Sequence, residues 1–70
     1  MVQNKQHIIN KIYGILKPLG VSDNHTTELF QTHGIDKVDR AIQHFLENKF
    51  EITFKKLDSY IGILADTTLN

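Results

Sequence analysis

The stretch that decides the fold runs from Thr27 to Ala41 and reads TELFQTHGIDKVDRA. Its second half opens an apolar stripe with spacings of three and four residues, which is the period of one helical face. The stripe consists of Val38, Ala41, Ile42, Phe45 and Leu46. Asp36 stands before it as an N-cap, and Asp39 adds a negative charge that favours a first turn. The sequence therefore predicts a helix over about 37–49.

The same spacing recurs upstream, at Ile9, Ile12, Leu16 and Leu19. It predicts a helix over about 3–17, which Pro18 either ends or kinks and which Gly20 terminates in a left-handed conformation. The following segment, 18–35, has no sustained period and is rich in Ser, Asp, Asn, Thr and His, so it is predicted to be a loop. Within that loop, a short turn is expected to carry two apolar side chains inward. Thr26 or Thr27 would cap this turn, and the inward side chains would be Leu29 and Phe30.

Downstream of the central helix, Phe50, Ile52 and Phe54 alternate with polar residues and predict an extended connector over 50–54 that fills the core. A third stripe predicts a helix over about 55–65, and the tail after it is expected to fray. This stripe consists of Leu57, Tyr60, Ile61 and Leu64. Together the elements predict one all-α domain over 1–70, a small three- to four-helix bundle with a long loop between helices 1 and 2. Its predicted core comprises Ile9, Ile12, Leu16, Leu29, Val38, Ile42, Phe45, Leu46 and Ile61.

Composition excludes several classes of function. The 70 residues hold eight basic and eight acidic side chains, so no long-range attraction to nucleic acid is expected. Cysteine is absent, and no two of the four histidines have helical i, i+4 spacing, so no metal site is expected. No apolar run approaches the roughly 20 residues of a membrane span, and the N-terminus does not read as a signal peptide. A cytoplasmic monomer is the expectation.

Several short motifs follow one another in an order found in one known family. They are Leu19-Gly20-Val21, Thr27-Glu28-Leu29-Phe30, Gly34-Ile35-Asp36, Val38-Asp39 and the run LENKFEI at 46–52. Over residues 5–52 the chain resembles an acyl carrier protein. In that family a Leu-Gly-Ile-Asp-Ser-Val/Leu-Asp motif opens the second helix, and its serine carries 4′-phosphopantetheine. The resemblance implies an acyl-carrier-like bundle whose third and fourth helices are merged or whose last helix is shortened, because only 18 residues follow Ile52.

The attachment serine of the family is missing from this chain. Lys37 occupies the matching position, or Asp36 does if a one-residue gap is placed differently, and neither residue has a hydroxyl. No bound cofactor is therefore expected. We interpret the chain as a non-catalytic, acyl-carrier-like module that lacks phosphopantetheine and binds a protein of a synthase or a regulatory complex. The alternatives are a working acyl or peptidyl carrier in fatty acid, polyketide or related synthesis, and an unrelated small helical binding domain.

Catalysis has no support in the sequence, which lacks a Ser-His-Asp set and a Gly-rich phosphate loop, so no enzyme and no catalytic residue are predicted. The aromatic residues at core spacing are expected inside the bundle rather than in a ligand cage; they are Phe45, Phe50, Phe54 and Tyr60. The predicted partner-binding surface is the exposed side of the second helix with the residue before it. It comprises His33, Lys37, Arg40, Gln43, His44 and Glu47. Lys37 and Arg40 lie three apart, so they should form a positive spot that faces an acidic patch on the partner.

Overall fold

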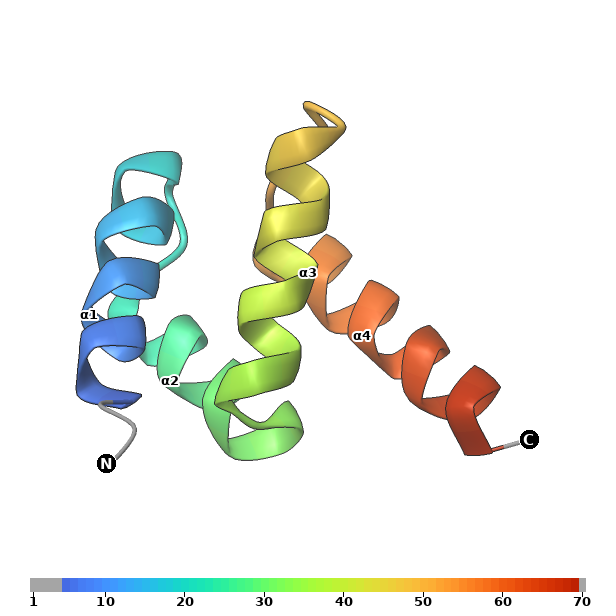
Figure 1. Cartoon of the computed structure of the whole chain (residues 1–70). Helices are drawn as coiled ribbons and strands as arrows, with labels where there is room; N and C mark the ends of the chain where they lie inside the picture. Colours follow the sequence, from blue (N-terminus) through green and yellow to red (C-terminus); the bar gives the residue numbers. More distant parts are fainter. Residues whose placement is uncertain (1–4, 70) are drawn as a thin grey trace.

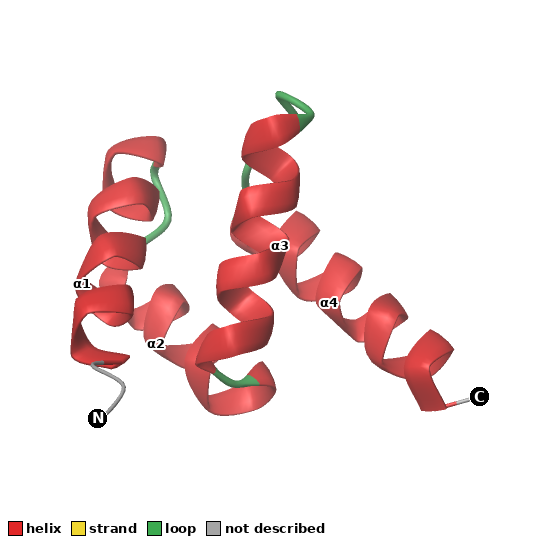
Figure 2. Cartoon of the chain, viewed as in Figure 1, coloured by secondary structure: helices red, strands yellow, loops and turns green. Residues whose placement is uncertain are grey.

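The computed structural model describes the backbone of residues 5–69 and the side chains of residues 5–64. Within this range the chain forms helices and no strand (Figures 1 and 2). The elements are α1 (Lys5–Leu16), the 3₁₀ turn η1 (Lys17–Leu19), α2 (Asp23–His33), α3 (Ile35–Glu47) and α4 (Phe54–Leu69). Helix α3 lies at the centre and contacts each of the other three α-helices. The predicted small all-α bundle is confirmed.

Helix α1 ends as the sequence predicts. The α-helix stops at Leu16, and Pro18 sits in the first turn of η1, where its missing N–H costs nothing. Gly20 follows at φ +96°, a left-handed conformation, and its N–H donates to the carbonyl oxygen of Lys17 at 3.1 Å. The start predicted near residue 3 falls outside the described residues.

The predicted loop over 18–35 is wrong, because most of it forms α2. Ser22 caps this helix: its Oγ accepts from the backbone N–H of His25 at 3.2 Å, and neither Thr26 nor Thr27 is the cap. Thr26 is instead completely buried, since its hydroxyl donates to the carbonyl oxygen of Ser22 at 3.1 Å and so needs no water. Leu29 is buried, as expected. A polar residue at a core position concealed the helical period.

Helix α3 is shifted by two residues from its predicted bounds, and its N-cap is Gly34 rather than Asp36. Asp36 lies in the first turn, where its charge still favours the helix dipole. Asp39 bridges to α1, with its Oδ1 at 3.2 Å from the Lys11 ammonium. Asp39 therefore also links α3 to α1 through this ion pair.

The connector before α4 fills the core only in part. Ile52 is buried and Phe54 is half-buried, but Phe50 is 52% exposed, so its predicted place in the core is wrong. Thr53 caps α4 by accepting from the N–H of Lys56 at 3.1 Å. The helix then continues to Leu69, so its predicted end near residue 65 is wrong. A single helix stands where the family would have two.

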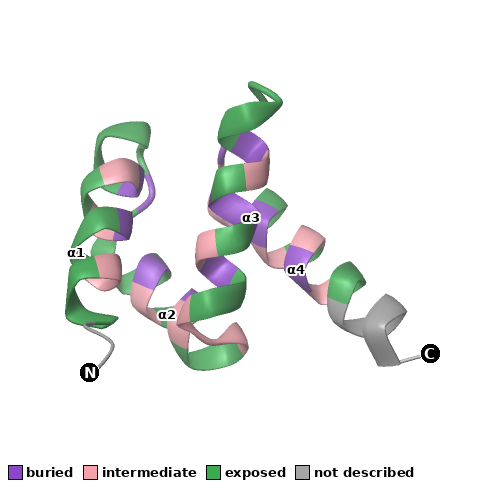
Figure 3. Cartoon of the chain, in the orientation of Figure 1, coloured by how far each residue is buried: buried purple, intermediate pink, exposed green. Residues whose placement is uncertain are grey.

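The core lies where α3 meets the other helices (Figure 3). Its buried apolar residues are Ile12, Leu16, Val21, Leu29, Val38, Ala41, Ile42, Phe45, Ile52, Leu57 and Ile61. Of the predicted core, Ile9 is only half-buried and Leu46 is 45% exposed. Successive residues of an α-helix point about 100° apart, so Leu46 turns away from the side that Phe45 buries. Its assignment to the core is wrong for that reason.

Candidate functional site

The start of α3 is built on a sharp reversal at Gly34. Its N–H donates to the carbonyl oxygen of Phe30 at 2.9 Å and ends α2, while its own carbonyl accepts from Val38 at 3.2 Å and begins α3. Gly34 has φ +94° and ψ 152°, a region that is essentially restricted to glycine. One residue therefore joins two helices and brings the first turn of α3 to the surface.

The position that matches the family's attachment serine lies in this exposed first turn. Asp36 and Lys37 are both exposed, so either register places the attachment position in solvent. The carboxylate of Asp36 and the ammonium of Lys37 cannot form the phosphodiester that a serine hydroxyl forms. The surface is accessible, and the reacting group is absent.

Four of the six predicted partner-binding side chains are exposed along α3: Lys37, Arg40, Gln43 and Glu47. Within the described residues, no carboxylate lies within ion-pair distance of Lys37 or Arg40, although other lysines of the chain are paired. The two charges are one helical turn apart and are open to solvent. They form the positive pair, a name we keep for Lys37 and Arg40.

The two predicted histidines serve packing instead. The side chain of His33 is only 12% exposed, and its Nε2 lies 2.7 Å from Asp58 Oδ1, which ties the end of α2 to α4. His44 stacks on Tyr60 with ring centroids 5.0 Å apart and an angle of 7° between the rings. Both side chains therefore pack against α4. His44 also lies one helical turn after Arg40 on α3, with its ring stacked on Tyr60.

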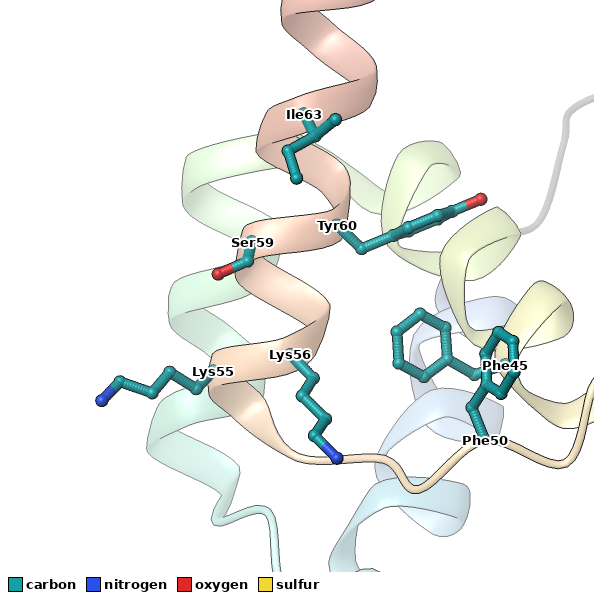
Figure 4. Close-up of a pocket in the computed structure, with 7 residues that line it drawn as sticks. All are labelled: Phe45, Phe50, Lys55, Lys56, Ser59, Tyr60 and Ile63. Atoms are coloured by element: carbon teal, nitrogen blue, oxygen red, sulfur yellow. The ribbon is translucent and has the colours of Figure 1, made fainter.

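A second surface feature was missed by the sequence reasoning. A hollow of about 510 Å³ opens between the C-terminal part of α3, the connector and α4 (Figure 4). It is lined by Phe45, Phe50, Lys55, Lys56, Ser59, Tyr60 and Ile63, and we call it the aromatic groove. The rings of Phe45, Phe50 and Tyr60 meet edge to face, with Phe45 5.7 Å from Phe50 and 5.4 Å from Tyr60.

The end of α3 fixes Phe50 in the wall of this groove. Lys49 is left-handed at φ +58°, and its N–H donates to the carbonyl oxygen of Leu46, while the N–H of Phe50 donates to that of Phe45. These two bonds form a Schellman motif, in which the residue after the left-handed position packs back on the helix. The motif uses lysine where glycine is usual, so the sequence carried no glycine signal for it.

No protein-family model matches the chain, and neither the curated proteins nor the solved structures include a significant match. In the described part of the chain, no three His, Cys, Asp or Glu side chains gather as a metal site would require. None of the helices between residues 5 and 69 combines the length and apolar character needed to cross a membrane.

Proposed function

We propose that this chain is an acyl-carrier-like, non-catalytic module that carries no phosphopantetheine and binds an acidic patch on a protein partner through the start of α3. The observation that carries the proposal is the exposed first turn of this helix. Asp36 and Lys37 are exposed there, at the positions that the resemblance matches to the family's serine, and no carboxylate of the described residues lies within ion-pair distance of the positive pair.

Electrostatics at this surface support an effect on association more than on final affinity. Lys37 and Arg40 are solvent-exposed, so water and salt weaken their attraction to any partner. Charges of this kind raise the rate of encounter and orient the partner before contact. Lysine in the first turn also opposes the helix dipole by roughly 0.3–1 kcal/mol, so stability of the helix gives no reason for its presence.

The test reverses both charges in the intact chain. A partner captured from the native cell by the wild-type protein is purified, and its association rate with Lys37→Glu/Arg40→Glu is measured at low and high salt. We expect the variant to associate about tenfold more slowly at low salt, with the difference fading as salt rises.

The matched control is Lys5→Glu/Lys17→Glu, which makes the same change in net charge at exposed lysines near the two ends of the α1–η1 segment. This control should associate like wild type, because neither lysine belongs to the positive pair. An unchanged association rate in a folded Lys37→Glu/Arg40→Glu protein would contradict the proposal.

A further inference from the structure

The aromatic groove exposes apolar surface in a fixed arrangement. Phe50 is 52% exposed, yet its backbone is held by the hydrogen bond from its N–H to Phe45, and its ring rests on the Phe45 ring. Tyr60 is held in turn by its stack on His44. A partner that covers these rings gains free energy from the burial of apolar surface. The entropy cost of binding is small, because the ring side chains are already held in place before the partner arrives.

Charge around the groove favours one sign of partner. The segment 49–56 carries three lysines and one glutamate, and Glu51 is engaged by Lys56 at 3.0 Å. No other carboxylate among the described residues lies within ion-pair distance of Lys49 or Lys55, so the segment presents a net positive charge beside Phe50. A second copy of the chain would set these like charges against each other, whereas an acidic partner would neutralise them.

The shape of the groove suits a helix. The α4 residues that line it run from Lys55 to Ile63, eight positions on, which corresponds to about 12 Å of helix or about two turns. Figure 4 shows the rings of Phe45 and Phe50 on one side of α4, and Lys55 extending from this helix on the side away from the rings. A partner helix that lies in such a groove inserts one or two apolar side chains and turns its polar face to the rim.

We infer that the aromatic groove docks an acidic amphipathic helix of a partner protein, with its apolar face on Phe50 and Tyr60 and its carboxylates toward Lys49 and Lys55. This surface shares no residue with the positive pair on α3. The inference therefore stands on its own evidence and can be tested without a known partner.

The probe is a synthetic helical peptide with leucines at i, i+3, i+4 and i+7 spacing and glutamates at its exposed positions. A second peptide replaces every glutamate by lysine. Binding of each to the full chain is followed by fluorescence anisotropy. We expect the glutamate peptide to bind and the lysine peptide to bind at least about tenfold more weakly. Phe50→Ala and Lys55→Glu should each weaken binding of the glutamate peptide, by about tenfold for the aromatic truncation.

Two control variants match these changes. Leu46→Ala removes an apolar side chain of similar exposure, 45%, from the same helix end but outside the groove, and Lys5→Glu reverses an exposed charge on α1. Both should bind the glutamate peptide like wild type. Lys55 is exposed, so its variant keeps the charge test valid even if Phe50→Ala loosens the fold.

Three results would overturn the inference. One is equal binding of both peptides, or of neither. Another is a loss of binding in Leu46→Ala as large as in Phe50→Ala. The third is sedimentation of the wild-type chain as a dimer that Phe50→Ala returns to monomer, which would make a second copy the occupant.

Discussion

Truncation of Phe45 tests which face of α3 is buried. Its side chain is 6% exposed and contacts the rings of Phe50 and Tyr60, so Phe45→Ala removes both buried area and edge-to-face contacts. Phe→Ala changes in cores cost about 3–5 kcal/mol. Because Phe45 also lines the aromatic groove, water can enter part of the space left behind, and we expect a cost near the lower figure, about 3 kcal/mol.

The neighbouring residue supplies the control. Leu46 was assigned to the core from the sequence but is 45% exposed, so Leu46→Ala should cost about 1 kcal/mol or less. In a domain of this size, 1 kcal/mol corresponds to about 4–8 °C in the thermal midpoint. The thermal midpoint of the helical circular dichroism signal should therefore be lower by at least about 12 °C in Phe45→Ala and by no more than about 4–8 °C in Leu46→Ala. Urea unfolding should give the same order.

The free energy of unfolding of the wild-type domain is expected to be on the order of 5 kcal/mol, so Phe45→Ala should be only marginally stable. A stabilising osmolyte keeps this variant folded at the start of the unfolding curve, so that its midpoint can be measured. Equal losses in the two variants, or a larger loss in Leu46→Ala, would refute the assignment of the buried face.

Three further tests probe the backbone and one link between helices. Gly34→Ala should destabilise the fold by about 1–3 kcal/mol, because φ +94° strains any residue other than glycine. Gly14→Ala, in the middle of α1, should stabilise it by about 0.5–1 kcal/mol. Urea unfolding in which both variants change stability in the same direction would contradict this. Lys49→Gly should stabilise the fold by about 0.5 kcal/mol and raise the thermal midpoint. The reason is that glycine removes the backbone strain of a left-handed lysine, and this gain exceeds the entropy that glycine adds to the unfolded chain. A lower midpoint would be evidence against the strain. His33→Ala and Asp58→Ala should show a coupling of about 1 kcal/mol in a double-mutant cycle, as expected for a hydrogen bond between two side chains, and purely additive losses would argue against that link.

The sequence predicts α1 and α3 well because each carries a stripe of purely apolar side chains. It fails at α2 because only two residues of the inward face, Leu29 and Phe30, are apolar. The helical spacing becomes visible only when the polar residues Thr26 and His33 are counted as part of that face. The burial of Thr26 depends on a hydrogen bond within the same helix turn, and that of His33 on Asp58, which lies 25 residues away in the chain. Periodicity of apolar residues cannot contain that information.

For the candidate site, too, one part could be predicted from the sequence and one part could not. The exposure of Lys37 and Arg40 follows from their position opposite the stripe on α3, and it was predicted from the sequence. The aromatic groove was not, because Phe50 alternates with Ile52 and so reads as a core residue. Its exposure is set by the left-handed residue before it, and a lysine gives no sign of that conformation.

The proposal that this chain carries no phosphopantetheine is tested most directly by the intact mass of the wild-type chain after incubation with coenzyme A and a promiscuous phosphopantetheinyl transferase. An authentic acyl carrier protein in the same reaction verifies the enzyme, and Lys37→Ser recreates the order Asp-Ser-Val at the start of α3. We predict an unchanged mass for the wild-type chain and the addition of one phosphopantetheine group to the serine variant. Addition of that group to the wild-type chain, at any residue, would contradict the proposed function.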